Sequence, residues 1–140
     1  MSYWSPITSQ DTSEPKTRFR DIVENIDAII SYVGDMGQEQ FIADRLRYDA
    51  TERCLSRISE AAIKLGMLAE ELAPNQPWND IRGLGNWLRH DYPNVIKTVI
   101  WKTVSRDLKP LRRDCEAAIR ELDRRSRREK RRAPKRDGGR

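Results

Sequence analysis

The sequence has few of the residues that metal sites and disulfide frameworks require. Its 140 residues include only two cysteines and one histidine. A structural zinc site needs clustered Cys and His ligands, and a disulfide framework needs more cysteines in an exported chain. Cys54 and Cys115 each fall on the apolar stripe of a predicted helix, so we expect two small buried hydrophobic residues. The sequence therefore predicts neither a bound metal nor a cofactor.

Long apolar runs are also missing. No stretch approaches the roughly 18 consecutive apolar residues that a membrane-spanning helix needs. The first ten residues lack the basic-then-apolar order of a signal peptide. We therefore expect no membrane association and a cytoplasmic location.

What the sequence does have is charge, and its distribution is uneven. Charged residues make up 35% of the chain and apolar residues 37%. Residues 124–140 hold ten Arg or Lys against Glu129 and Asp137, a net charge of +8, which leaves the rest at −3 of the total +5. Because Ala133 is the only apolar residue of this tail, we expect the tail to be disordered. It could bind RNA through counterion release, or merely keep the chain soluble.

Apolar residues spaced three and four apart predict helices along most of the chain. The predicted helices cover 17–33, 39–72, 78–90, 94–104, and a last segment that follows a cap at Ser105 or Asp107 and ends near 122. No strand is predicted. The length suits one domain. We expect a mobile arm over residues 1–16 and an all-α, antiparallel bundle of four to five helices over 17–123.

The predicted helix 78–90 carries the residues with the most chemistry. At about 100° per residue, one face is apolar and should point into the bundle: Ile81, Leu84 and Leu88. Beside it, within an arc of about 100°, lie four polar residues: Arg82, Asn86, Arg89 and His90. Trp87 falls between these faces, where it could line a dimer interface or stack on a base; we favour the interface.

These four residue types suit cleavage of an RNA phosphodiester. His90 can take or give a proton near neutral pH, while Arg82 or Arg89 can hold a phosphate through paired hydrogen bonds. RNA supplies its own nucleophile, the 2′-hydroxyl. The reaction needs both a base and an acid, which a two-fold dimer with two His90 side chains would supply. Alternatively, His90 is a helix cap or a surface residue, and the arginines are ordinary surface charges.

The predicted helix 78–90 leads into a His-x-Tyr sequence, His90-Asp91-Tyr92. Other distinctive stretches lie elsewhere in the chain: Ala50-Thr51-Glu52-Arg53, Ile58-Ser59-Glu60-Ala61-Ala62, Ile100-Trp101 and Leu108-Lys109-Pro110-Leu111. Through these stretches residues 17–122 resemble the HepT toxin ribonucleases of the HEPN superfamily, a family that carries an Arg a few residues before a His-x-Tyr motif. The resemblance implies a HEPN-type bundle and a homodimer with the His segments near the dimer cleft. It also implies a metal-independent RNA endonuclease acting as the toxin of a HepT/MntA-like type VII toxin–antitoxin system.

The resemblance also implies a partner. The antitoxin would be a minimal nucleotidyltransferase that transfers AMP onto Tyr92. One departure stands out, since the Arg of the family pattern should lie at positions 83–85, which hold Gly, Leu and Gly. Arg82 or Arg89 could replace it. The alternative is a catalytically degenerate protein that binds a nucleotidyltransferase or a nucleotide without cleaving RNA.

Overall fold

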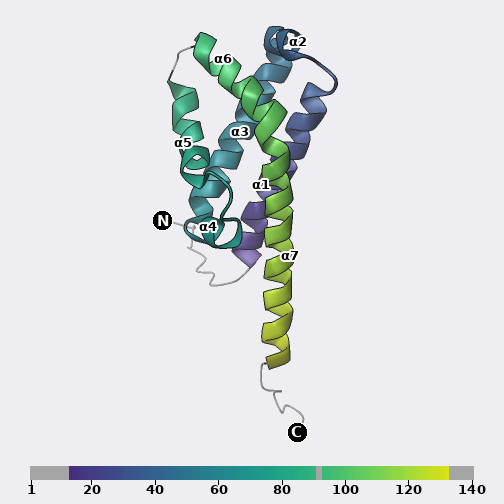
Figure 1. Cartoon of the computed structure of the whole chain (residues 1–140), viewed down its shortest axis with the longest axis vertical. Coiled ribbons are helices and arrows are strands. Elements are labelled where there is room, and N and C mark those ends of the chain that lie inside the picture. Colours follow the sequence, from purple (N-terminus) through teal and green to yellow (C-terminus); the bar gives the residue numbers. More distant parts are fainter. Residues whose placement is uncertain (1–12, 91–92, 133–140) are drawn as a thin grey trace, which may run out of the picture.

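The computed structural model describes residues 13–90 and 93–132, and these fold as a bundle of helices without a strand (Figure 1). The elements are α1 Ser13–Val33, α2 Gln38–Ala43, α3 Arg45–Leu65, α4 Leu68–Leu72, α5 Trp78–Arg89, α6 Pro93–Lys102, the π-helical segment η1 Thr103–Asp107, and α7 Leu108–Arg132. The predicted all-α bundle is confirmed. None of the described helices combines the length and the apolar character that crossing a membrane requires.

Buried residues of α1, α3 and α7 supply most of the core; α1 packs against both α3 and α7, and α5 packs against α3. One face of α1 is fully buried along its length: Phe19, Ile22, Ile26 and Ile29. Each such side chain contributes about 1.5–3 kcal/mol by leaving water. Cys54 of α3 and Cys115 of α7 are buried free thiols, as predicted. Burial raises the pKa of Cys115 to about 12, so this thiol stays protonated.

The predicted helix over 39–72 is in fact three helices, and two residues explain the breaks. Asp44 is extended (φ −89°, ψ 91°), and its side chain accepts a hydrogen bond from the backbone N–H of Arg47, which makes it the N-cap of α3. Gly66 has φ +58°, a conformation that favours glycine, and it ends α3 before α4 turns away. Each break depends on one local residue, Asp44 or Gly66. The apolar periodicity, from which a single long helix was predicted, continues across both breaks.

The predicted break at Ser105 is wrong, because α6, η1 and α7 follow one another without a gap. Ser105 does not cap a helix; its hydroxyl donates back to the carbonyl of Trp101. The Leu108 N–H bonds to the Thr103 carbonyl, five residues back, as in a π-helix. Pro110 lacks an N–H, so regular α-helical bonding would fail nearby in any case. The continuous rod formed by α6, η1 and α7 bends at this wider turn. As a result α6 contacts α2, while α7 packs on α1 (Figure 1).

Two predicted boundaries also need correction. Residues 13–16, expected in a mobile arm, form the start of α1, where Lys16 makes an ion pair with Asp123 of α7. Residues 124–132, expected in a disordered tail, continue α7 past its last buried residue, Leu122. The remaining parts of the predicted arm and tail, 1–12 and 133–140, lie outside the described residues.

Candidate active site at the carboxyl end of α5

Helix α5 is anchored at its amino end by Trp78. The indole is 1% exposed, and its N–H donates to the backbone carbonyl of Ala73 at 2.7 Å. Pro77 precedes the helix, where its missing N–H costs nothing. At the other end the chain turns extended at His90 (φ −93°, ψ 124°), whose backbone N–H bonds to the carbonyl of Trp87. The helix therefore begins in the core and ends with His90 at the surface.

Close packing against α3 fixes the position of α5. Gly85 is buried, and its backbone N–H donates to the hydroxyl of Ser59 at 3.1 Å. The same hydroxyl donates to the carbonyl of Arg82 at 2.8 Å. A Cβ atom at Gly85 would lie 3.2 Å from the Ser59 oxygen, tighter than an ordinary contact. The absence of a side chain at Gly85 thus lets the two helices approach closely.

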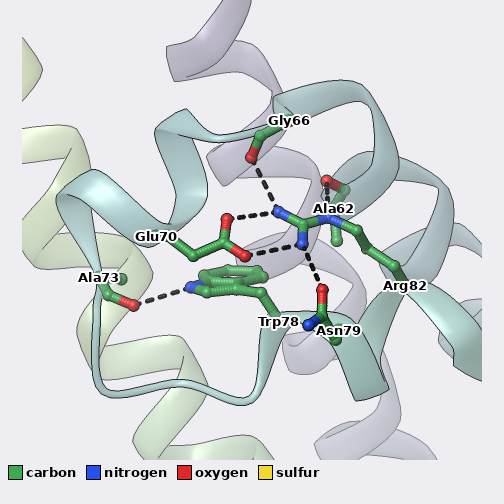
Figure 2. A network of polar contacts seen from close by, with 7 residues as sticks. All are labelled: Ala62, Gly66, Glu70, Ala73, Trp78, Asn79 and Arg82. Carbon is green, nitrogen blue, oxygen red and sulfur yellow. Dashed lines mark hydrogen bonds and ion pairs between the residues drawn. The ribbon is translucent and has the colours of Figure 1, made fainter.

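Arg82 is occupied by the protein itself (Figure 2). Its guanidinium forms a two-pronged ion pair with Glu70, with N–O distances of 2.6 and 2.8 Å. It also donates to the carbonyls of Ala62 and Gly66 at the carboxyl end of α3, and to the side chain of Asn79. An arginine has five N–H donors, and these five bonds use them all. We call this arrangement the Arg82 clamp.

The Arg82 clamp has an electrostatic consequence. The hydrogen bonds from the Arg82 guanidinium hold the pKa of Glu70 below its usual range, and Glu70 in turn raises the pKa of Arg82. Both groups are therefore charged, and the cation is neutralised where it stands. In this arrangement Arg82 has no free donor for a phosphate, so it does not join the other predicted site residues.

Asn86 and Arg89 belong to the last turn of α5, and His90 is its carboxyl-terminal cap. All three are exposed. Their side chains form no hydrogen bond or ion pair with any other residue that the structure describes. Free donors and a free imidazole are what a site for a phosphate anion needs. Tyr92 and Asp91, the rest of the predicted motif, lie outside the described residues.

The other side of α5 leaves apolar surface open. Ile81, Leu84, Trp87 and Leu88 pack against the core, as predicted for three of them, but they remain only half-buried. A groove of about 710 Å³ runs beside them, between α5, α3 and the η1–α7 segment. Its walls include Leu55, Ile58, Val99, Leu108 and Leu111. His90 is not among the groove's lining residues, so the polar cluster and the groove are neighbouring but separate features.

Among residues 13–90 and 93–132, no group of His, Cys, Asp and Glu side chains is arranged to hold a metal ion. The prediction of a metal-free site stays a prediction.

Comparison with known proteins gives this cluster a context. The family described as HepT-like ribonucleases matches residues 22–118, which is most of the chain. This chain belongs to the HepT-like ribonuclease family. The family explains why the resemblance is spread over all the long helices rather than confined to the His-x-Tyr motif, and it confirms the predicted assignment to a ribonuclease family.

Several relatives share the greater part of their length with this chain. The inferred RNase MJ0125 of Methanocaldococcus jannaschii is 30% identical over 103 residues, which cover 74% of this chain and 89% of that protein. The inferred ribonuclease HepT of Thermococcus cleftensis is 31% identical over 97 residues, covering 69% and 88%. No solved structure gave a significant match.

Two structural residues of the site were not foreseen from the sequence. Glu70 and Ser59 hold α5 in place, yet neither lies in the motif around His90. Gly85 was the one local signal, because a glycine within a helix often marks a close approach of another element. Nothing in the sequence marked Glu70 as the partner of Arg82, since the two meet only after α3 turns at Gly66.

Proposed function

We propose that this chain is a metal-independent RNA endonuclease with His90 as its acid–base group and Arg89 and Asn86 as its phosphate ligands. The observation that carries the proposal is the exposed cluster at the end of α5, which forms no hydrogen bond or ion pair among the described residues, in a chain of the HepT-like ribonuclease family. Arg82 was an equal candidate in the sequence. The Arg82 clamp favours Arg89 as the cation of the site.

The proposed reaction is an internal transesterification. The 2′-oxygen attacks the neighbouring phosphorus as it loses its proton, and the bond from phosphorus to the 5′-oxygen breaks as that oxygen gains one. The products are a 2′,3′-cyclic phosphate and a 5′-hydroxyl. Neutral His90 can accept the first proton, and a protonated imidazole can donate the second. Arg89 would stabilise the charge on the phosphate oxygens as the transition state forms.

We further propose that the active form is a homodimer. One chain holds a single histidine, whereas the reaction needs a base and an acid at once. The half-buried apolar side of α5, next to the His90 cluster, is a surface that a second copy could cover. Replacing Trp87 with Ser should raise the dissociation constant of the dimer in analytical ultracentrifugation. The exposed Gln38→Ala variant is the control, and an unchanged constant for Trp87→Ser would place the interface elsewhere.

The proposed role in the cell is that of a toxin with a minimal nucleotidyltransferase as its antitoxin. AMP transfer onto Tyr92 would place a phosphate and an adenine two residues from His90, where Arg89 is available to pair with the new charge. The support is the resemblance of the His90-Asp91-Tyr92 motif. Mass spectrometry after co-expression with a nucleotidyltransferase should find one added AMP on the wild type and none on Tyr92→Phe.

The competing function is a protein that binds its partner without cleaving RNA. The observation that favours it is the clamped Arg82, together with the Gly-Leu-Gly at positions 83–85 where the family has its Arg. Expression of the chain alone in a bacterium distinguishes the two. Growth arrest with loss of RNA for the wild type, and normal growth for His90→Ala, supports the nuclease; intact RNA in both supports the binding protein.

A further inference from the structure

The last part of α7, residues 124–132, extends beyond the bundle (Figure 1). No apolar residue follows Leu122 in the helix, so this part has no face to bury. Its sequence, RRSRREKRR, holds seven cations against Glu129. We call residues 124–132 the basic extension.

Most cations of the basic extension have no ion-pair partner among the residues that the structure describes. Arg124 and Arg125 pair with Glu121, and Arg125 also reaches Glu71 of α4. Five cations form no ion pair with a residue that the structure describes: Arg127, Arg128, Lys130, Arg131 and Arg132. Several of these stand three or four positions apart, where like charges on a helix repel. A polyanion laid along the extension would remove that repulsion.

The cations are also unevenly distributed around the helix. At about 100° per residue, all seven fall within an arc of about 220°, while Ser126 and Glu129 occupy the remainder. A helix that binds membranes needs an apolar face opposite its basic one, and the extension has none. A broad basic surface, mostly of arginines and without apolar neighbours, suits a phosphate backbone, since guanidinium groups bind phosphates through paired hydrogen bonds.

We propose that the basic extension binds the phosphate backbone of RNA without regard to sequence, as a second contact outside the cleavage site. The proposal rests on the proposed function in one respect, namely that RNA is the polyanion this chain meets. Such contacts give affinity through the release of counterions, and the affinity falls steeply with salt.

The position of the extension predicts which RNAs it helps to bind. His90 precedes α6, and α6, η1 and α7 form one uninterrupted rod. At about 1.5 Å per residue the path along this bent rod from residue 93 to residue 124 is at most about 45 Å. A stacked strand rising about 3.4 Å per nucleotide spans this with roughly 13 nucleotides. RNAs much shorter than this should not reach both places on one chain.

The test measures RNA binding in a His90→Ala background, so that no cleavage occurs. In one variant the five unpaired cations of the extension become Gln, a good helix former. The probes are fluorescent single-stranded RNAs of roughly 30 and roughly 6 nucleotides. At about 0.7 per phosphate contact, the slope of log affinity against log salt should fall by up to about 3.5 for the long RNA. The parent should then lose about a hundredfold more affinity than the variant between about 50 and 200 mM salt.

A matched variant tests whether the location of the charge matters. It replaces five exposed cations of the bundle that also form no ion pair among the described residues: Arg53, Lys64, Lys109, Arg113 and Arg120. Its salt slope for the long RNA should fall less than that of the extension variant. Equal slopes for these two variants, or an unchanged slope for the extension variant, would overturn the proposal.

The short RNA adds a second criterion. If the five Gln substitutions weaken the binding of the short RNA as much as that of the long RNA, the extension does not act as a distant second contact. Because binding rather than cleavage is measured, the outcome does not depend on the nuclease proposal. A wild type that leaves RNA intact, but shows the predicted difference in slope, contradicts the proposed function alone.

Discussion

Arg82→Met separates a structural arginine from a catalytic one. Methionine is an unbranched helix former but brings no hydrogen-bond donor, so the carbonyls of Ala62 and Gly66 and the carboxylate of Glu70 lose their partner. The Arg82 side chain is 21% exposed, so water replaces part of what is lost. For the two bonds to backbone carbonyls we expect a loss of about 2–3 kcal/mol, or roughly 6–12 °C in Tm for a chain of this size.

The assay pairs thermal melting, followed by circular dichroism, with the rate of RNA cleavage well below both melting temperatures. Arg82→Met should melt early but cleave at nearly the wild-type rate. The free energy of unfolding of Arg89→Met should lie within about 0.5 kcal/mol of the wild-type value, because Arg89 is exposed. This variant should nevertheless cleave RNA about 10²–10³ times more slowly. Glu70→Met breaks the same clamp from its other side. If Arg82→Met abolishes cleavage below its melting temperature and Glu70→Met does not, then Arg82 acts on the substrate and the clamp reasoning is refuted.

Further predictions concern packing, pH and metal ions. Gly85→Val should destabilise the fold by about 1–3 kcal/mol by overpacking against Ser59; denaturant unfolding checks this, and an unchanged midpoint would contradict it. Because Arg82 lowers the pKa of Glu70, the stability that this pair adds is complete above the ordinary Glu value of 4.5 and is lost as the pH falls through the lowered pKa. The Tm difference between the wild type and Glu70→Gln should therefore shrink only in acid; a difference that shrinks around neutral pH would indicate another group. Excess EDTA should leave the cleavage rate unchanged, since the proposed chemistry uses protein groups alone, and a loss restored by added Mg²⁺ would point to a metal.

The sequence predicts the helices well where periodicity alone decides. The buried face of α1, from Phe19 to Ile29, follows from spacings of three and four. The pattern fails where a local polar contact competes with it. At Asp44 a side-chain cap starts a new helix although the apolar stripe continues. At Ser105 the expected cap instead bonds backward to Trp101, and a π-turn carries the helix through to Pro110.

The candidate site was predictable only in part, because only part of it depends on the periodicity of a single helix. Placing α5 on a helical wheel groups Asn86, Arg89 and His90, and that grouping depends on one helix only; the structure has Asn86 and Arg89 in the last turn of α5 and His90 as its cap. Arg82 lies near them on that wheel, but its environment depends on where α3 ends and α4 begins. The position of Glu70 follows from the turn at Gly66, a long-range consequence that no wheel contains.

The most direct test of the account is the cleavage rate of purified protein on a defined single-stranded RNA in the presence of EDTA, for the wild type, His90→Ala and the exposed control Arg113→Ala. The account predicts that the wild type and the control cleave alike and leave 2′,3′-cyclic phosphate ends, while His90→Ala is slower by about 10²–10⁴. Equal rates for His90→Ala and the wild type, or no cleavage by a folded wild-type protein, would contradict it.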